Sequence, residues 1–448
     1  MRAFPYGPAP LAILCLAVVS GLFLAKDQAK KPKRATLTYW TFARPHYEAY
    51  QKALPKFLEE HPGVTVDLQL VDGQGLNQRL RAAFQADLDV PDMVEIEISA
   101  AGSFFRGPKE HIGFLDITDR LKSEGLDKKI VASRFAPYTN RGSIFGLPHD
   151  VHPVMLAYNR EKFKELSLDP AQLDTWDKFI EAGVKVKQPG KQYLLEMSDT
   201  GTSQLELCLF QRDGGYFDPD GKVIFDNETG IETMKWYVPL VAKNSKRQIG
   251  NALSSSFGQV MTQALESGYF LSVVTPDWRS KNHEKDVAKM SGKMGLMPMP
   301  AIKPGGRRTS TWGGTMLGIT KACASKDLAW DFAKFLYLNE KDLAERYADT
   351  NILPPVPSAW SQPAFDKEYP YYAGQKIGRD YAALAPQVPP QYASAFVELG
   401  KGKLGQALIQ CVEYYNAHGE DAGWDAFVRS TVKSRADEVR QQMARNPF

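Results

Sequence analysis

Residues 35–71 read ATLTYWTFARPHYEAYQKALPKFLEEHPGVTVDLQLV, and this one segment predicts three consecutive elements. Residues 35–42 are rich in Thr, Tyr and Trp, which predicts a short strand. Residues 64–71 alternate apolar and polar side chains after the turn at 61–63, which is typical of a half-buried strand. Apolar residues between them recur at helical spacing, at Tyr47, Tyr50, Leu54, Phe57 and Leu58. The segment therefore predicts a strand, a helix that Pro55 should kink or split, and a second strand.

The same alternation of strands and helices continues along the chain. Further strands are predicted at 93–98, 269–274, 295–300 and 316–319, and further helices at 76–86 and between 320 and 340, with Ser325 as the N-cap of the latter. Strands separated by helices favour parallel sheets with crossover helices. The sequence thus predicts an α/β fold.

Length and composition limit the class of protein. A chain of 448 residues exceeds one ordinary core, so two lobes are expected. With 43% hydrophobic and 24% charged residues it is not a polytopic membrane protein. The net charge of +3 resides at the N-terminus, since residues beyond 35 include 49 basic and 51 acidic side chains. A nearly neutral body argues against a nucleic-acid partner.

The N-terminal segment predicts the compartment. Residues 11–25, LAILCLAVVSGLFLA, form an apolar run between Arg2 and a basic cluster. We interpret 1–25 as a signal peptide or N-terminal membrane anchor and 26–35 as a basic linker. Phe23 is bulky at the −3 position before a cut after Ala25, which leaves cleavage open. The expected location is periplasmic or extracytoplasmic, with anchoring to the cytoplasmic membrane where cleavage fails.

The cysteines and catalytic motifs are uninformative about chemistry. Cys15, Cys208, Cys323 and Cys411 are scattered, so buried thiols are favoured over a disulfide framework, with one bridge left open. The chain has no GxSxG elbow, HExxH motif or P-loop. His149 and His152 could form half of a metal site, but hydrogen-bonded neutral histidines are favoured. We expect no catalytic residue, no metal and no cofactor.

Short segments spread over 36–448 resemble one family when taken in order. They are TYWTF at 38–42, FLEEHPGVTV at 57–66, PDMVEIE at 91–97, FGLPHDVHPVMLAYNREKF at 145–163, DTWDKF at 174–179, RDGGYFDPDG at 212–221, TPDWRS at 275–280 and WGGTMLGITKACASKDLAWDFAKFLYLNE at 312–340. Together they resemble the extracellular solute-binding proteins (family 1) of bacterial carbohydrate ABC importers, the group that includes maltose-binding protein. Two places depart from the family pattern: 43–46 replaces a small-residue loop, and His149 and His152 lie where acidic or hydroxyl side chains are more usual.

The resemblance implies a two-lobed fold of the periplasmic-binding-protein type II, in which each lobe is a mostly parallel sheet flanked by helices. Residues 36–148 plus 294–350 would form lobe 1, and 149–293 plus 351–448 lobe 2. The ligand cleft would lie between the lobes and close by hinge motion. Turn-rich stretches at 146–148, 298–306 and 353–355 agree with such boundaries.

A sugar ligand needs aromatic rings for its C–H faces and planar polar groups for its hydroxyls. The aromatic candidates are Trp278, which follows a strand and matches the family's cleft wall, and Trp312, whose neighbour Gly313 would let the ligand approach the backbone. Trp40 ends the first strand, with a core position as the equal alternative, and Tyr392 lies near a Pro-rich joint.

Five polar residues are further candidates. Glu97 is favoured over Glu95 because it lies nearer the end of its strand, and Arg44 follows the first strand. The resemblance assigns ligand contact to Asp150 and His152 after the crossover turn, with a hinge or surface role as the alternative. It also places Gln204, in the loop 199–204, in a ligand-contacting region.

The predicted function is that of a monomeric, non-enzymatic binding protein. It would capture a sugar or oligosaccharide and deliver it to the permease subunits of an ABC importer. Alternatives left open are a binding protein for another solute (a polyamine, a sugar phosphate or a peptide), a ligand-sensing subunit, and an extracellular carbohydrate-active enzyme. The sequence leaves open the identity of the sugar, its affinity and the cognate permease.

Overall fold

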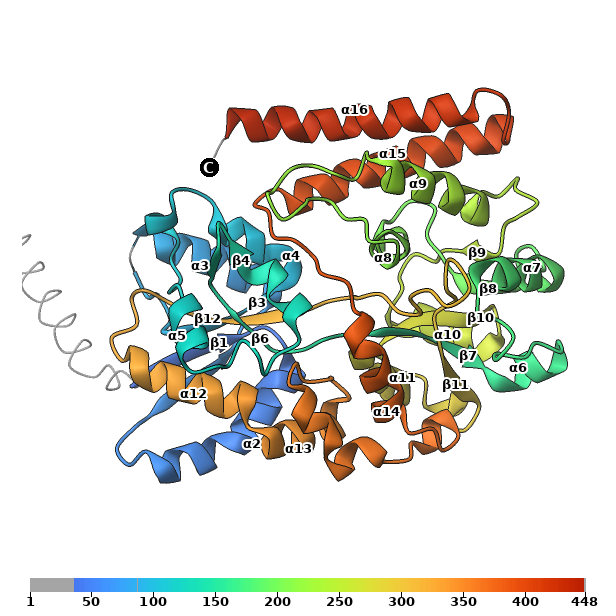
Figure 1. The fold of residues 1–448 in the computed structure, drawn as a ribbon. Helices are drawn as coiled ribbons and strands as arrows, with labels where there is room; N and C mark the ends of the chain where they lie inside the picture. The colour runs from blue at the N-terminus through green and yellow to red at the C-terminus, as the bar shows by residue number, and fades with distance from the viewer. Residues whose placement is uncertain (1–35, 87, 447–448) are drawn as a thin grey trace, which may run out of the picture.

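The structure, a computed structural model, describes residues 36–86 and 88–446 and contains two five-stranded sheets, each at the centre of one lobe (Figure 1). The predicted signal peptide or anchor, the basic linker and Cys15 lie outside the described residues. Within the described part of the chain, no helix combines the length and apolarity needed to cross a membrane.

The first sheet has the strand order β2-β1-β3-β12-β6. Its strands are β1 (Leu37–Thr41), β2 (Val66–Leu70), β3 (Met93–Glu97), β12 (Thr315–Ile319) and β6 (Leu147–Pro148). β1 pairs in parallel with β2 and β3, whereas β12 is antiparallel to β3 and β6. The helices of this part are α2 (Arg44–Glu60), α3 (Gly73–Ala86), α4 (Ile98–Ala101), α5 (Thr118–Ser123), α12 (Lys326–Leu338) and α13 (Glu340–Thr350), with a small hairpin of β4 (Thr139–Asn140) and β5 (Ser143–Ile144).

The second sheet has the order β11-β7-β10-β8-β9. Its strands are β7 (Val154–Asn159), β8 (Tyr193–Glu196), β9 (Gly250–Asn251), β10 (Phe270–Pro276) and β11 (Met294–Pro298). Its helices are α6 (Arg160–Glu165), α7 (Trp176–Val186), α8 (Ser203–Gln211), α9 (Glu228–Val241), α10 (Gly258–Ser267), α11 (Asp277–Asp286), α14 (Ile377–Leu384), α15 (Val397–His418) and α16 (Trp424–Arg445). Along the whole described chain, short 3₁₀ helices lie at Gly102–Phe105, Lys109–His111, Ala132–Arg134, Ala136–Tyr138, Ala288–Met290, Pro357–Ser361, Pro363–Asp366, Pro370–Tyr372 and Ala385–Gln387.

The predicted α/β class is confirmed, and the structure corrects three details. Each sheet is mixed rather than mostly parallel, because strands that enter after an interlobe crossing run against their neighbours. β11 pairs with β7 in the second sheet, so the lobe boundary predicted at 294 is wrong, and the chain crosses after Pro298. Pro55 does not split α2, because it lies on the exposed face, where water can hydrate the carbonyl group that lacks a donor.

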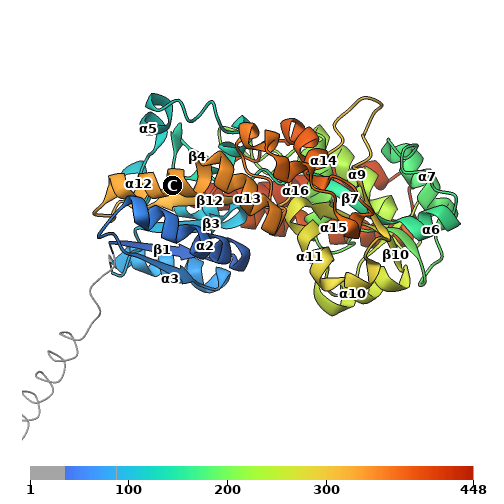
Figure 2. The same ribbon diagram turned by 90° about the horizontal axis from the view of Figure 1, so that it is seen from below.

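Crossing segments connect the sheets. Residues 149–153 lead from β6 to β7, and residues 299–314 lead from β11 back to β12. These two segments lie side by side, with an antiparallel bridge between Pro153 and Thr311. A third passage follows α13, where the backbone N–H of Val151 donates to the carbonyl oxygen of Leu353 at 3.0 Å. From below, α13 and α14 lie near the junction of the lobes (Figure 2).

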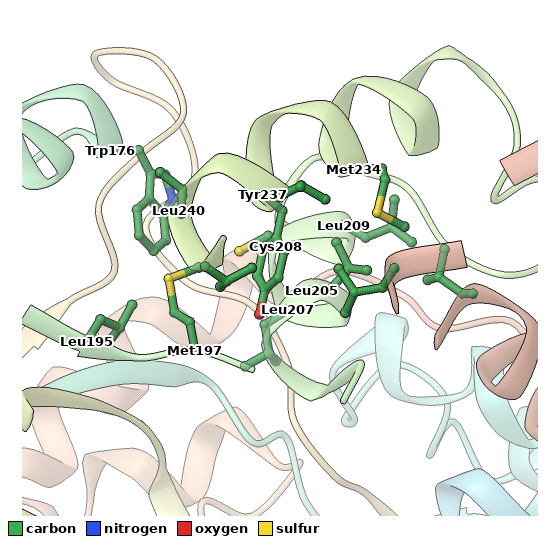
Figure 3. Packing of buried hydrophobic residues seen from close by; sticks show 14 of the residues in the cluster. Trp176, Leu195, Met197, Leu205, Leu207, Cys208, Leu209, Met234, Tyr237 and Leu240 are labelled. Carbon is green, nitrogen blue, oxygen red and sulfur yellow. The ribbon is translucent and has the colours of Figure 1, made fainter. Parts of the chain in front are cut away.

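The core of the second lobe is built around α8, which is buried on nearly all sides. Leu205, Leu207, Cys208 and Leu209 of this helix are buried among side chains of β8 and α9 (Figure 3). α15 and α16 contribute to the same cluster, so the C-terminal hairpin is part of this core. Cys208, Cys323 and Cys411 are buried free thiols.

Candidate functional site

Two adjoining cavities lie between the lobes. The first, of about 270 Å³, is lined by the end of β3, by α8 and the loop that follows it, and by residues 389–401. The second, of about 330 Å³, is lined by Phe42, Ala43, Pro45 and His46, by α11, and by the end of α13 with Ile352. Both are lined by Glu97, Trp312 and Gly313. Because these three residues form a shared boundary, we treat the two cavities as one interlobe cleft with two compartments.

Glu97 lies where the first sheet meets the cleft. It is the last residue of β3 and the N-cap of α4, and its carboxylate accepts hydrogen bonds from the backbone N–H of Ser99 at 2.8 Å and from the Ser99 hydroxyl. Burial raises the pKa of Glu97, and the bonds from Ser99 act against that rise. Both bonds reach the same oxygen, so the second carboxylate oxygen is available to a ligand in the cleft.

Glu95, two residues earlier on the same face of β3, has a different environment. Its side chain is fully buried and accepts hydrogen bonds from four donors, namely the hydroxyls of Thr41, Tyr50 and Tyr337 and the Nδ1–H of His46. Burial alone would raise the pKa of Glu95, but His46 and the other donors hold it well below its usual range. Glu95 is therefore a structural anchor, and the sequence preference for Glu97 as the cleft residue agrees with the placement of both.

Trp278 and Trp312 form an aromatic wall. Trp278 is in the first turn of α11, directly after β10, and Trp312 is in the crossing segment before β12. Their ring centroids are 5.9 Å apart at an interplanar angle of 73°, an edge-to-face pair. The indole N–H of Trp278 donates to the carbonyl oxygen of Trp312 at 3.0 Å. The two predicted aromatic residues thus form one hydrogen-bonded unit at the cleft.

Gly313 closes the wall with a conformation that other residues rarely adopt. Its φ is 95°, and a Cβ placed there would lie 3.3 Å from Cδ2 of His152 and 3.4 Å from Nε1 of Trp278. The position thus requires glycine both for the backbone and for the close approach of its neighbours.

A buried network of charges lies beneath the second compartment. His152, which lines that compartment, is held by Asp277 (Nδ1 to Oδ1, 2.6 Å) and by Asp150 (Nε2 to Oδ2, 3.1 Å). Burial would lower the pKa of His152, but the two aspartates raise it to about 10, so the ring is an imidazolium. The carboxylate of Asp277 also accepts the backbone N–H of Leu353 at 2.6 Å. The network joins both lobes through residues of the crossings.

Asp150 is not on the cleft surface, which corrects its prediction as a ligand contact. It is fully buried, and its carboxylate receives Arg134 at 3.3 Å and His149 at 3.1 Å in addition to His152. Burial would raise the pKa of Asp150, but the neighbouring histidines hold it well below its usual range. It lies in the crossing segment 149–153, where a buried charge must be paired, and the alternative hinge role stays a prediction.

Three further predicted residues line neither compartment. Trp40 is 2% exposed and packs in the core of the first lobe, with the Arg79 guanidinium 3.9 Å from the ring centroid. Arg44 is exposed at the start of α2, although neighbouring residues line the second compartment. Gln204 is buried in the first turn of α8 rather than in a loop. It lies two residues, about 200° of helical rotation, from Glu206, which does face the cleft.

Tyr392, the last of the candidates, lines the first compartment. Its contact with a ligand stays a prediction.

Sequence reasoning missed most of the first compartment. Glu206 of α8 accepts the hydroxyls of Tyr216 at 2.7 Å and Thr202 at 2.8 Å, and Lys401 approaches it at 3.5 Å. Burial would lower the pKa of Lys401, but Glu206, Glu398 and Glu97 raise it. The run RDGGYFDPDG contained the signal, because its residues 213–217 line this compartment.

Sequence reasoning also missed the polar residues of α11 that line the second compartment, although their spacing in the sequence was a simple signal. Trp278, Lys281, Asn282 and Lys285 all line it, and their spacing of three and four residues is one face of α11. Polar residues at helical spacing after a predicted ligand residue were therefore the available sign of this compartment.

Among the described residues, one group of three has side chains close enough to hold a metal ion together: His46, Glu95 and His149, whose ligand atoms lie within 4.8 Å of one another. The pair weighed from the sequence was His149 and His152, and His152 is instead held between two aspartates. The ring centroids of His46 and His149 are 4.0 Å apart. Burial and the neighbouring His46 lower the pKa of His149 to about 4. His149 is thus neutral at pH 7, as the prediction of neutral hydrogen-bonded histidines requires, whereas the charged His152 contradicts that prediction.

The chain belongs to the family of bacterial extracellular solute-binding proteins, whose pattern it matches over residues 43–342. This confirms the family resemblance found in the sequence.

Curated relatives and solved structures agree with the assignment. The chain is 26% identical over 339 residues to an arabinooligosaccharide-binding protein of Halalkalibacterium halodurans, covering 75% of each chain. It is 24% identical over 364 residues to an arabinooligosaccharide-binding protein of Bacillus subtilis, covering 81% of this chain and 82% of that one. The fold is similar to the sugar-binding protein MalE of Xanthomonas citri, with a TM-score of 0.71 at 18% identity over 91% of this chain and 98% of the other.

Proposed function

We propose that this protein is the extracytoplasmic substrate-binding subunit of an ABC importer and that its cleft captures a sugar or oligosaccharide. The observation that carries the proposal is the shared boundary of the two compartments, where Glu97, Trp312 and Gly313 line both cavities. An indole and a carboxylate with a free oxygen supply what a sugar ring needs, an apolar face and a hydrogen-bond acceptor.

The compartment linings favour an oligosaccharide over a single small ion. Each compartment combines rings with polar side chains, Tyr216 and Tyr392 with Glu206 in the first, and Trp278 with Asn282 in the second. A ligand that spans both would contact Trp312 twice, from each side of the boundary. The oligosaccharide-binding relatives support the same class of ligand.

Binding would be coupled to hinge motion. We assign residues 36–148 and about 315–350 to lobe 1, and 154–298 with the C-terminal helices to lobe 2, with the crossings as hinges. Closure would bring Glu97 of one lobe toward Trp278 of the other. The closed form would then be presented to the permease subunits by a monomer, held at the membrane by the N-terminal segment where that segment is retained.

Calorimetry and thermal unfolding against a panel of glycans test the proposal. The panel contains arabino-oligosaccharides, lactose and malto-oligosaccharides, with an amino acid, a polyamine and a sugar phosphate as controls. A glycan bound at 100 times its Kd stabilises the fold by about 2.7 kcal/mol, a readily measured rise in Tm. A rise with a control solute and with no glycan would refute the sugar assignment.

Two further measurements test the hinge closure and the non-enzymatic assignment. Solution scattering should show a smaller radius of gyration when the ligand is bound. Incubation with the bound glycan should return it unchanged, as expected of a binding protein. Release of a shorter product would contradict the non-enzymatic assignment.

A further inference from the structure

Phe257 has an unusual environment for a phenylalanine. Its side chain is 47% exposed, in the loop between β9 and α10 and immediately before the first residue of α10. Most large apolar side chains in the described parts of the two lobes are buried in the cores. An exposed aromatic ring is informative only when its neighbours give it a context.

That context is the aromatic wall of the cleft. The Phe257 ring is 6.1 Å from the Trp278 ring, centroid to centroid, at an interplanar angle of 26°. This distance and angle are those of an offset, nearly parallel aromatic pair. Trp278 in turn contacts Trp312 edge to face. Three rings from three separate segments thus form a series, Phe257–Trp278–Trp312, that runs from the shared boundary of the compartments to an exposed position.

A buried arginine holds both ends of this series. The Arg279 guanidinium lies 5.1 Å from the centroid of the Phe257 ring and 5.5 Å from that of the Trp312 ring, and its side chain is almost fully buried. It donates to the carbonyl oxygens of Val274 at 2.8 Å and Ser256 at 2.5 Å. Glu196 balances its charge at 3.4 Å.

The bond to Ser256 matters because Ser256 immediately precedes Phe257. Anchoring that carbonyl group to a buried side chain fixes the position of the loop that presents the ring. A ring fixed before binding loses little conformational entropy when a ligand covers it. The exposed position of Phe257 is therefore a built feature of the second lobe.

We infer that Phe257 is an outer stacking subsite that takes a further sugar ring of an oligosaccharide whose inner rings occupy the cleft. The inference rests on the proposed function and extends it, because it makes affinity depend on ligand length. A sugar ring that covers the exposed half of Phe257 removes apolar surface from water, whereas a monosaccharide stacked on Trp312 is too short to reach it.

The test is the affinity of the full chain for a homologous series of one glycan, from one to five sugar units, measured by calorimetry. Phe257→Ala should leave the affinity for the shortest binding ligand unchanged and lower that for the longest by about tenfold. Phe257→Leu, which keeps apolar bulk without a flat face, should lose nearly as much, and Phe257→Tyr should retain wild-type affinity. Val260→Ala is the matched control, because Val260 is 41% exposed on α10 and should affect no ligand.

The outcomes separate the two proposals. Equal loss for every ligand length, or none for the longest, would overturn the outer subsite and leave the proposed function intact. Failure of the unaltered protein to bind any glycan would overturn both. An unchanged Tm of the four variants shows that differences in affinity come from the subsite, and Phe257→Tyr serves as the readout if the alanine variant unfolds.

Discussion

The indole N–H of Trp278 donates to the carbonyl oxygen of Trp312 at 3.0 Å, which ties the first turn of α11 to the crossing segment that returns the chain to the first lobe. The acceptor is a backbone atom, so the bond survives any substitution of the Trp312 side chain. The two residues of the wall can therefore be tested separately, one for its ring and the other for its N–H.

Trp312→Ala should weaken binding of every ligand that the protein takes by about 10- to 100-fold, because the ring lines both compartments. Calorimetry gives the affinity, and the Tm should fall by only a few degrees because the ring is partly exposed. Trp236→Ala, on α9 and away from both compartments, is the control that should retain full affinity. Equal loss in both variants would contradict the assigned role.

Trp278→Phe keeps an aromatic ring and removes the donor. The carbonyl group of Trp312 then lacks its partner, and we expect about 1 kcal/mol of destabilisation with a severalfold loss of affinity. Denaturant unfolding and calorimetry on the same sample check this. Wild-type stability with full loss of binding would show that the N–H contacts the ligand rather than the backbone.

Glu95→Gln should mainly reduce stability, whereas Glu97→Gln should mainly reduce ligand affinity. Glu95 accepts hydrogen bonds from four donors in the core. An amide replaces one of its acceptor oxygens by an NH₂ group that faces those donors, and we expect a loss of about 2–4 kcal/mol in unfolding free energy. Glu97→Gln can still cap α4 and should mainly weaken ligand binding, by about tenfold. Urea unfolding with calorimetry distinguishes them, and a reversed pattern would refute the assignment.

Gly313→Ala should cost about 1–3 kcal/mol of stability, because its φ of 95° is strained for alanine and its Cβ would press on His152. Gly402→Ala is the matched control. Gly402 lies inside α15, and a Cβ there would meet open space, so alanine should stabilise the helix by up to about 1 kcal/mol. Similar effects at both positions would show that neither the backbone nor the neighbours constrain Gly313.

His152 predicts a loss of stability at alkaline pH. Its folded pKa of about 10 is above the ordinary value of 6.5, so its contribution is complete below about pH 6.5 and is lost as the pH rises toward 10. Unfolding free energy should fall by roughly 2 kcal/mol or more across this range, and His152→Gln should remove most of that slope. Parallel curves for the two proteins would contradict a charged His152.

The lowered pKa of His149 predicts that stability falls as the pH decreases in the acid range. Its folded pKa of about 4 is below 6.5, so the unfolded chain binds the proton more readily, and stability falls as the pH drops from about 6.5 to 4. His149→Gln should flatten the acid side of the profile and leave the alkaline side unchanged. Urea unfolding at half-unit pH intervals measures both slopes.

Much of the fold followed from local patterns. The alternation in 64–71 and the spacing of the apolar face in 47–58 predicted β2 and α2, because each element exposes one face to solvent. The placement of β11 could not be predicted in this way. Its apolar run is compatible with either sheet, and its pairing with β7 depends on strands more than a hundred residues away.

The candidate site likewise contains residues that local sequence patterns predict and residues that only distant contacts place. Glu97 and Trp278 were accessible to sequence reasoning because each lies at or just after the carboxyl end of a strand, where cleft loops occur. Trp312 and Gly313 instead precede β12, whose start lies at the same sheet edge because β12 is antiparallel to β3. Trp40 satisfies the same rule and is nevertheless a core residue, since helix α3 brings Leu76 and Leu80 over it. Phe257 gave no signal at all, because its role arises from contacts with Trp278 and Arg279.

By itself, the sequence determined the α/β class and the family, because these depend on composition, periodicity and short ordered motifs. The tertiary structure alone decided which polar residues line the cleft. Glu95 and Glu97 share one face of one strand, yet Tyr337, 242 residues further on, helps cover Glu95. A side chain is exposed to the cleft or sealed in the core according to what packs against it, and distant segments supply that packing.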